Sequence, residues 1–248
     1  MPRYEAKRVA VIGGTSGMGL ATARLMKDQG ASVIVTGRTE ANVNAARQQL
    51  GDGTLVLTSD TTRLADIDAL AERITEHVGG LDALFVSAGI SRAASLQDTT
   101  ETVYDEVFAV NAKGAYFTVQ RLAPLMRRGG GIVLATSVSN VKGLPNNSVY
   151  AASKAALRSM ARTLARELLP HGVRVNAVSP GPIDTGILDR SLPEAAADAT
   201  KRQMRENNPM GRFGTPEEVA AAVAFLAFEA TFTTGAELPV DGGVSQLV

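Results

Sequence analysis

A tyrosine and a lysine stand four residues apart in the stretch SVYAASKAAL, at Tyr150 and Lys154. On a helix this spacing places both side chains on the same face. A free tyrosine has a pKa of about 10 and transfers protons poorly near neutral pH. A lysine ammonium beside the phenol favours the phenolate and lowers that pKa, so the pair could move a proton. Such pairs also occur on ordinary surface helices, and the rest of the chain has to decide between the two interpretations.

Short apolar runs alternate with longer helical patterns along the chain. The runs are rich in valine, isoleucine and leucine, as strands buried on both faces of a sheet are. They are RVAVIG, SVIVTG, TLVLTSD, LDALFVSAG, GIVLATS, VRVNAVSPG and AELPVDGG. Helices are expected at residues 18–29, 40–50, 64–78, 99–126, 149–169 and 216–228. This alternation predicts an α/β fold, a Rossmann-like doubly wound sheet of about seven parallel strands with helices on both faces.

One segment departs from the alternation. Residues 185–208 follow the sixth apolar run and carry a helical pattern of their own, marked by Ile187, Leu188, Leu192 and Met204. The remaining residues are all used by strands and helices of the sheet. We therefore expect a single domain over residues 1–248, with an insertion at about 185–210.

The composition excludes several classes of protein. The chain has 25 lysines and arginines against 25 aspartates and glutamates, so it lacks the basic excess of a nucleic-acid-binding protein. It has no cysteine, which excludes disulfides and thiolate chemistry. The apolar stretch near the N-terminus is too short for a signal peptide or a membrane span, and we expect a cytoplasmic protein. His77 and His171 have no metal-ligand spacing around them, so no metal site is expected.

Three glycines lie where the first apolar run meets the first helical pattern. In VAVIGGTSGMGLATA they are Gly13, Gly17 and Gly19, a G-x-x-x-G-x-G pattern. Gly13 permits a sharp turn off the strand, and a side chain at Gly17 or Gly19 would obstruct a pyrophosphate or the helix–strand contact. Free amides at the helix N-terminus would then face the phosphates. This position in the chain predicts a dinucleotide-binding site rather than merely a tight turn.

The end of the second apolar run indicates which dinucleotide is bound. NAD-binding chains usually have an acidic residue here, which holds the ribose 2′-hydroxyl. This chain reads VIVTGRTE, with Gly37 in the place of the acid and Arg38 next to it. A guanidinium matches a phosphate, and Thr36 or Thr39 could add a hydroxyl, so NADP(H) is favoured over NAD(H). The alternative is that Arg38 is a solvated surface arginine, and the nearby Glu40 would weaken its attraction for a phosphate.

Together with the glycine loop, Ser137, Tyr150 and Lys154 resemble the single-domain short-chain dehydrogenase/reductase family over nearly the whole chain. The family's TGxxxGxG motif reads IGGTSGMG, and its YxxxK motif runs from Tyr150 to Lys154. Ser137 precedes Tyr150 at the spacing of the family's catalytic serine, and Asn111 in VNAKG matches its active-site asparagine. The stretches NAVSPGPIDTG, PMGRFGTPEEVAAAVAFLA and TTGAELPVDGG match further family segments.

The resemblance implies roles for four of these residues. Tyr150 would act as the acid in ketone reduction and as the base in alcohol oxidation. Lys154 would hold the nicotinamide ribose, and Ser137 would hydrogen-bond the substrate oxygen. Asn111 would position a water that links Lys154 to solvent. The expected cofactor-binding residues are Gly13, Thr15, Ser16, Gly17, Met18, Gly19, Arg38, Thr39, Asp60, Thr61, Ala88, Gly89, Tyr150, Lys154, Pro180, Gly181, Ile183 and Thr185.

Two departures from the family pattern concern the sheet. Ile12 stands in the place of the usual threonine, and the NNAG motif reads VSAG, with Val86 and Ser87 replacing both asparagines. Lost amide hydrogen bonds would change stability rather than activity, and Ser87 could replace one of them. Neither departure touches Ser137, Tyr150 or Lys154.

The sequence says less about the substrate. In the family a lid after PGPIDTG covers the pocket, so Ile187, Leu188, Leu192 and Met204 are candidate lid residues, with ordinary helix packing as the alternative. Candidate walls are Ser91, Val138, Leu144 and Asn146. These residues are mostly apolar, which favours a ketone, or a secondary alcohol in the reverse direction, with an apolar side.

Two alternatives remain open. Arg92 and Lys142 would suit a 3-oxoacyl-thioester substrate on an acidic acyl carrier protein or on coenzyme A. The other alternative is a catalytically silent NADP(H)-binding sensor, against which the intact catalytic set counts. The resemblance also implies a homotetramer and a small-molecule carbonyl or alcohol substrate.

Overall fold

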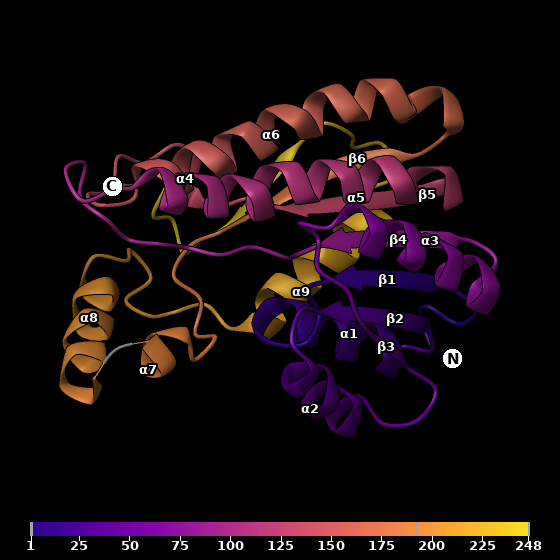
Figure 1. The fold of residues 1–248 in the computed structure, drawn as a ribbon, viewed down its shortest axis with the longest axis horizontal. Coiled ribbons are helices and arrows are strands. Elements are labelled where there is room, and N and C mark those ends of the chain that lie inside the picture. Colours follow the sequence, from indigo (N-terminus) through magenta and orange to yellow (C-terminus); the bar gives the residue numbers. More distant parts are fainter. Residues whose placement is uncertain (1, 192, 248) are drawn as a thin grey trace.

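The computed structural model describes residues 2–191 and 193–247, which form one sheet of seven parallel strands (Figure 1). The strands are β1 (Arg8–Ile12), β2 (Ser32–Gly37), β3 (Leu55–Thr58), β4 (Leu81–Val86), β5 (Met126–Ala135), β6 (Arg174–Pro180) and β7 (Glu237–Val240). Their order is β3-β2-β1-β4-β5-β6-β7. The order reverses between β1 and β4, the switch point at which doubly wound sheets bind ligands. The predicted Rossmann-like fold is confirmed.

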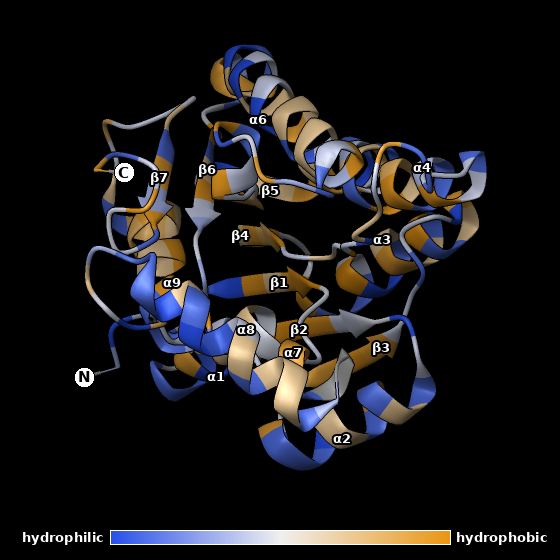
Figure 2. Ribbon diagram, turned by 90° about the vertical axis from the view of Figure 1, so that its left-hand side faces the viewer, coloured by the Kyte–Doolittle hydropathy of each residue, from blue (hydrophilic) through white to orange (hydrophobic). Residues whose placement is uncertain are grey.

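The strands bury alternate residues on opposite faces, as the two-residue period of a strand requires. Val9 and Val11 of β1 pack against α1, α2 and α9, whereas Ala10 and Ile12 pack against α3, α5 and α6. Figure 2 shows the apolar residues gathered on the strands in the middle of the molecule. Burial on both faces explains why the strands read as continuous apolar runs.

Most of the predicted helices form at the predicted residues. Those that match or nearly match are α1 (Gly17–Asp28), α2 (Glu40–Leu50), α3 (Leu64–Val78) and α6 (Ser148–Leu168). The helix predicted over 216–228 is α9 (Pro216–Ala224) followed by a π-helical turn at Phe225–Glu229. A capping box between Thr215 and Glu218 begins α9.

The helix predicted over 99–126 is not continuous. It consists of α4 (Glu101–Phe108), a π-helix η1 (Ala109–Gly114), α5 (Ala115–Leu122) and a 3₁₀ turn at Ala123–Leu125. At Gly114 the π-helix lies against the loop after β3, because a Cβ there would be 2.8 Å from the carbonyl oxygen of Thr61. Apolar periodicity predicts a helix here but does not reveal the wider turn. Such turns often occur at functional sites.

The insertion forms two helices, α7 (Ile187–Ser191) and α8 (Glu194–Glu206). They lie beyond the end of the sheet, at the left of Figure 1, and α8 is largely hydrophilic in Figure 2. Leu192, one of the candidate lid residues, lies outside the described residues. No helix in the described part of the chain is both long and apolar enough to cross a bilayer.

Candidate active site

The glycine loop borders a cavity of about 310 Å³ at the switch point of the sheet. Gly13 has a φ of 78°, and a Cβ there would lie 2.6 Å from the backbone nitrogen of Ala88 after β4. Gly19 packs directly on the carbonyl of Gly13 and does not line the cavity. The helix α1 begins at Gly17, so its unpaired amides lie at the cavity edge. Such a cradle has the backbone geometry that a pyrophosphate needs.

Most residues expected to bind the cofactor line this cavity. They are Gly13, Thr15, Ser16, Gly17, Met18, Arg38, Thr39, Asp60, Thr61, Ala88, Gly89 and Thr185. Tyr150, Pro180, Gly181 and Ile183 line a second cavity of about 890 Å³, which shares Met18, Thr185 and Ile187 with the first. The two cavities are therefore neighbours. Asn42 also lines the first cavity, and no motif in the sequence pointed to it.

Where β2 ends, the first cavity is lined by one exposed cation, Arg38, and the strand end carries no acidic residue. Arg38 forms no ion pair with any residue in 2–191 or 193–247. Gly37 is buried, and a Cβ there would lie 2.5 Å from the hydroxyl oxygen of Thr15. An aspartate at Gly37 would collide with Thr15. The Thr39 hydroxyl accepts a hydrogen bond from the amide of Asn42 and caps α2, which leaves its own proton to donate.

Asp60 is held in a turn next to this end of the cavity. One of its carboxylate oxygens accepts hydrogen bonds from the amide (2.9 Å) and the hydroxyl (2.8 Å) of Thr62. The other carboxylate oxygen has no partner among the described residues and could accept a hydrogen bond from an adenine ring.

Tyr150 and Ser137 lie side by side on the wall of the larger cavity. Ser137 follows β5, and Tyr150 is in the first turn of α6, so the two meet at the carboxyl end of the sheet. Burial raises the pKa of Tyr150 above its ordinary value, and the hydrogen bond with Ser137 lowers it by less. The phenol is therefore protonated at neutral pH and can donate to an oxygen bound beside it.

Lys154 is buried beneath Tyr150. Its ammonium lies 5.7 Å from the centre of the Tyr150 ring and donates a 2.7 Å hydrogen bond to the carbonyl oxygen of Ala135. Burial lowers the pKa of Lys154 to about 8. In the chain by itself burial sets the direction of the Tyr150 pKa, and the expectation that Lys154 and the oxidised cofactor lower it stays a prediction.

Asn111 joins the π-helix to two parts of the site. Its carboxamide oxygen accepts from the amide of Ile90 (2.8 Å), and its nitrogen donates to the carbonyl of Ile90 (2.9 Å) and to the hydroxyl of Ser153 (3.0 Å). A Cβ on Gly89 would lie 3.3 Å from that carboxamide oxygen and 3.2 Å from the Lys154 ammonium. Asn111 thus fixes the loop after β4 beside Lys154.

A partly buried carboxylate supports the segment that carries Ser137. One oxygen of Glu237 in β7 accepts from the hydroxyl of Thr136 and from the amide of Asn140, each at 2.6 Å. The other oxygen forms an ion pair with Arg158 of α6 at 2.8 Å. Glu237 thereby links both sides of Ser137 to the helix of Tyr150. The sequence shows no sign of this role, because Glu237 lies far along the chain from the residues it binds.

The larger cavity has mostly the expected walls. Ser91, Val138, Leu144, Ile187, Leu188 and Met204 line it. Asn146 does not, because it has a φ of 59° and lies in the turn before α6; its neighbour Asn147 lines the cavity instead. Ser139, between Val138 and Asn140, is a further polar wall that the sequence did not indicate.

The altered NNAG motif has a simple structural consequence. The backbone nitrogens of Ser87 and Ala88 both donate to the carbonyl oxygen of Ile12, at 2.8 and 2.9 Å. The Ser87 side chain forms no hydrogen bond with the described residues, so the expectation that it replaces an asparagine contact is wrong. Backbone groups alone join the ends of β1 and β4.

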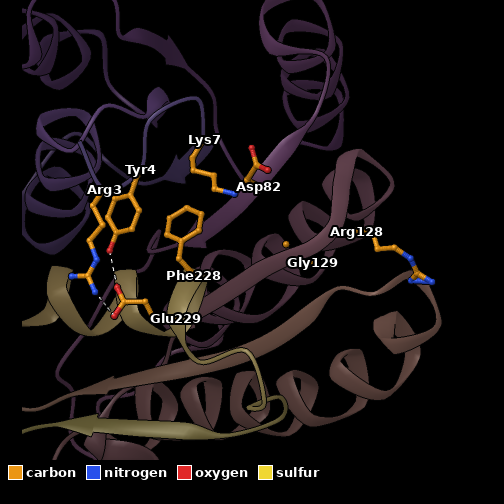
Figure 3. Close-up of a pocket in the computed structure, with 9 residues that line it drawn as sticks. Arg3, Tyr4, Lys7, Asp82, Arg128, Gly129, Phe228 and Glu229 are labelled. Carbon is orange, nitrogen blue, oxygen red and sulfur yellow. Dashed lines mark hydrogen bonds and ion pairs between the residues drawn. The ribbon is translucent and has the colours of Figure 1, made fainter. Parts of the chain in front are cut away.

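A third cavity, of about 340 Å³, lies at the opposite end of the strands (Figure 3). Here Arg3 pairs with Glu229 at 2.8 Å, and the Tyr4 hydroxyl donates to the same carboxylate at 2.9 Å. Burial and this hydrogen bond raise the pKa of Tyr4 to about 12. Arg128 points away from the other labelled residues in Figure 3. These contacts tie the N-terminal segment to the turn after α9 and bring together no catalytic set.

Replacing Lys154 should reveal how much the burial of its ammonium group lowers the stability of the folded chain. Its pKa is about 8 in the folded chain against 10.5 ordinarily, so between these values the unfolded chain binds more protons. The lysine therefore opposes folding fully below its folded pKa, and this cost disappears as pH rises through that window. We expect Lys154→Met to lose activity yet melt several degrees above the wild type at about pH 7, with the gap closing towards about pH 10. Thermal unfolding followed by circular dichroism measures this, and a gap that grows with pH would contradict it.

Comparisons with known proteins show the family to which the chain belongs. A family model described as enoyl-(acyl carrier protein) reductase matches residues 13–245. An oxidoreductase of Sarocladium schorii, asL5, is 39% identical, covering 99% of this chain and 98% of its own. The 3-oxoacyl-(acyl-carrier-protein) reductase FabG of Thermotoga maritima is 35% identical, covering 98% and 99%. The structure of a double mutant of a Serratia marcescens short-chain dehydrogenase/reductase superposes with a TM-score of 0.89 at 30% identity, covering 99% of this chain and all of the other. The chain belongs to the short-chain dehydrogenase/reductase family.

Proposed function

We propose that this oxidoreductase uses NADP(H) to reduce a ketone to a secondary alcohol, or catalyses the reverse reaction, with Tyr150 as the proton donor. The observation that carries the proposal is that Tyr150 and Ser137 lie together on the wall of a large cavity beside the nucleotide cavity. A proton donor and a second hydrogen-bonding group at one point suit a carbonyl oxygen on which negative charge develops.

The residues present fit a phosphorylated dinucleotide. The glycine loop and the first turn of α1 would hold the pyrophosphate, and Arg38 with Thr39 would hold the 2′-phosphate. When bound, NADPH would supply a hydride to the carbonyl carbon. The shared border of the two cavities at Met18, Thr185 and Ile187 supports this arrangement.

The side chains of the protein would orient the substrate, donate the proton and stabilise the resulting charge. Ser137 would orient the substrate oxygen, and Tyr150, protonated at neutral pH, would donate its proton to that oxygen. Lys154, fixed by the carbonyl of Ala135, would place a positive charge below the phenol as the phenolate forms. The helices α7 and α8 would act as a lid that excludes water when substrate is bound. The proposal keeps the single domain and the cytoplasmic location expected from the sequence.

A 3-oxoacyl-thioester reductase is the second candidate. It is favoured by the similarity to the Thermotoga maritima protein, which is a 3-oxoacyl-(acyl-carrier-protein) reductase. Arg92 no longer supports it strongly, since its guanidinium pairs with Glu106 at 3.5 Å. Turnover of an acetoacetyl thioester well above that of simple ketones would establish this candidate.

The proposal is tested by following NADPH and NADH oxidation spectrophotometrically over a panel of ketones. We expect turnover with NADPH to exceed turnover with NADH. A protein that binds NADPH tightly but consumes none across the panel would be a silent NADP(H)-binding sensor, and the proposal would be abandoned.

We also predict a homotetramer. Exposed aromatic residues on α4 and α5 support it: Tyr104 stacks on Phe108 with ring centres 4.6 Å apart, and Tyr116 is exposed on the next helix. Large apolar side chains left in water favour association. Light scattering at micromolar concentration should give four times the mass of one chain, and a monomeric mass would contradict the prediction.

A further inference from the structure

A second hydrogen-bonding position lies next to Ser137. Ser139 is only 6% exposed and lines the substrate cavity. Its hydroxyl oxygen is 3.2 Å from the hydroxyl oxygen of Ser137 and accepts a hydrogen bond, also of 3.2 Å, from the side-chain nitrogen of Asn147. When Ser137 donates instead to a bound carbonyl oxygen, the hydroxyl proton of Ser139 has no acceptor besides Ser137 within the part of the chain that the structure describes.

Asn147 also has hydrogen-bonding capacity left over. Its side chain donates to Ser139, and its carboxamide oxygen has no partner among residues 2–191 and 193–247. Asn147 precedes the first turn of α6 but does not cap the helix with its side chain. Helix geometry therefore does not account for an asparagine side chain at this place. The open donor of Ser139 and the open acceptor of Asn147 both border the substrate cavity.

We propose that Ser139 and Asn147 bind a second oxygen of the substrate, and that the substrate is a ketone with a neutral oxygen on its α or β carbon. This inference rests on the proposed function, because Ser137 has to hold the reacting carbonyl. The 3.2 Å between the two serine oxygens is comparable to the separation of the two oxygens in a 2-hydroxy ketone or a 3-oxo ester folded to one side. One oxygen would accept from Ser137 and Tyr150. The other would accept from Ser139 and, where it is a hydroxyl, would also donate to the carboxamide oxygen of Asn147.

The charge of the cavity indicates that the second oxygen is neutral. Lys142 is the one cation among the described lining residues, and its ammonium donates to the backbone carbonyl of Val244 at 2.8 Å. No arginine lines the described cavity, so a substrate carboxylate would lack the bidentate partner that usually binds it. The remaining nearby walls include Val138, Leu188 and Met204, which suit the hydrocarbon part of the substrate.

The experiment compares matched pairs of ketones with NADPH. Ethyl acetoacetate is paired with 2-heptanone, and acetoin with 3-methyl-2-butanone, so that each pair differs in the second oxygen and little in size. We expect the wild type to prefer the oxygenated member of at least one pair by about tenfold or more in kcat/KM, because a site built for a hydroxyl or carbonyl discriminates against analogues that lack it. The pair that shows the preference tells whether the second oxygen lies on the α or the β carbon.

Three variants then locate the source of the preference. In Ser139→Ala and in Asn147→Leu we expect the ratio of kcat/KM between the two members of the pair to fall about tenfold. The matched control is Ser32→Ala, which removes an exposed hydroxyl at the start of β2, at the opposite end of the strands from the substrate cavity; there the ratio should stay at the wild-type value. Thermal unfolding checks that each variant folds. If Ser139→Ala does not fold, because Ser139 is buried, then Asn147→Leu, at a partly exposed position, provides the test.

The outcomes separate the two proposals. Equal loss on both members of a pair in both variants would mean that Ser139 and Asn147 only support Ser137, and the inference would be wrong. A wild type that reduces ketones without preference for the oxygenated members would also overturn the inference and leave the proposed function intact. A wild type that reduces neither member of either pair would overturn both.

Discussion

A Tyr150→Phe variant is expected to lose ketone reduction by about a thousandfold while still binding NADPH. Removing a positioned proton donor costs roughly two to four orders of magnitude in rate. Phenylalanine keeps the ring and removes only the hydroxyl that meets Ser137, so the fold and the nucleotide cavity should be unchanged. The measurement is kcat with saturating NADPH, together with NADPH affinity by fluorescence titration.

Two controls make this result specific. Tyr104→Phe removes a hydroxyl from an exposed tyrosine on α4 and should leave kcat within a factor of about two. Ser137→Ala should lower kcat by about a hundredfold, since the substrate oxygen keeps Tyr150 but loses its second hydrogen bond. A Tyr150→Phe enzyme as fast as the wild type would overturn the assignment of the proton donor.

An Arg38→Gln variant is expected to lose kcat/KM with NADPH by about ten- to a hundredfold and to change little with NADH. A hydrogen bond to a charged group contributes about 1.5–3 kcal/mol, and each 1.4 kcal/mol is about tenfold. Arg38 has no acidic partner among the described residues, so its guanidinium does not have to leave an ion pair to bind a phosphate. Kinetics with both cofactors and one ketone measure the ratio directly.

The control for Arg38 is another exposed arginine, on α3, that does not line the first cavity. Arg73 on α3 pairs with Glu76 at the surface, and Arg73→Gln should leave the ratio of NADPH to NADH turnover unchanged. Faster turnover of the wild type with NADH, or equal loss with both cofactors in Arg38→Gln, would contradict the assignment of Arg38.

Local sequence patterns were sufficient for the fold, and together with the family resemblance they predicted the outline of the site. Strands buried on both faces must be apolar throughout, so the seven runs could be found without knowledge of their neighbours. Parallel strands end at the same edge, so residues that follow β1, β4, β5 and β6 had to meet there. The motif around Tyr150 and Lys154 needed only the helical repeat to place both side chains on one face.

Contacts between segments that are far apart in the chain could not be predicted from these local patterns. Asn111 binds the backbone of Ile90 and the hydroxyl of Ser153, and Glu237 holds the segment around Ser137 from the last strand. No period in the sequence relates such partners, because their approach depends on how helices and strands pack. The wider π-turn that aims Asn111 has no signature in the apolar pattern for the same reason.

The sequence by itself determined the apolar runs that form the strands, the glycine loop, the spacing of Tyr150 and Lys154 and the absence of an acid at Gly37. Only the tertiary structure decided the rest: that Thr15 leaves no room for a side chain at Gly37, that burial raises the pKa of Tyr150 despite Lys154, and that Ser139 joins Ser137 on the cavity wall. Sequence patterns report what each segment buries, whereas burial depth, free space and hydrogen-bond partners belong to the packed molecule.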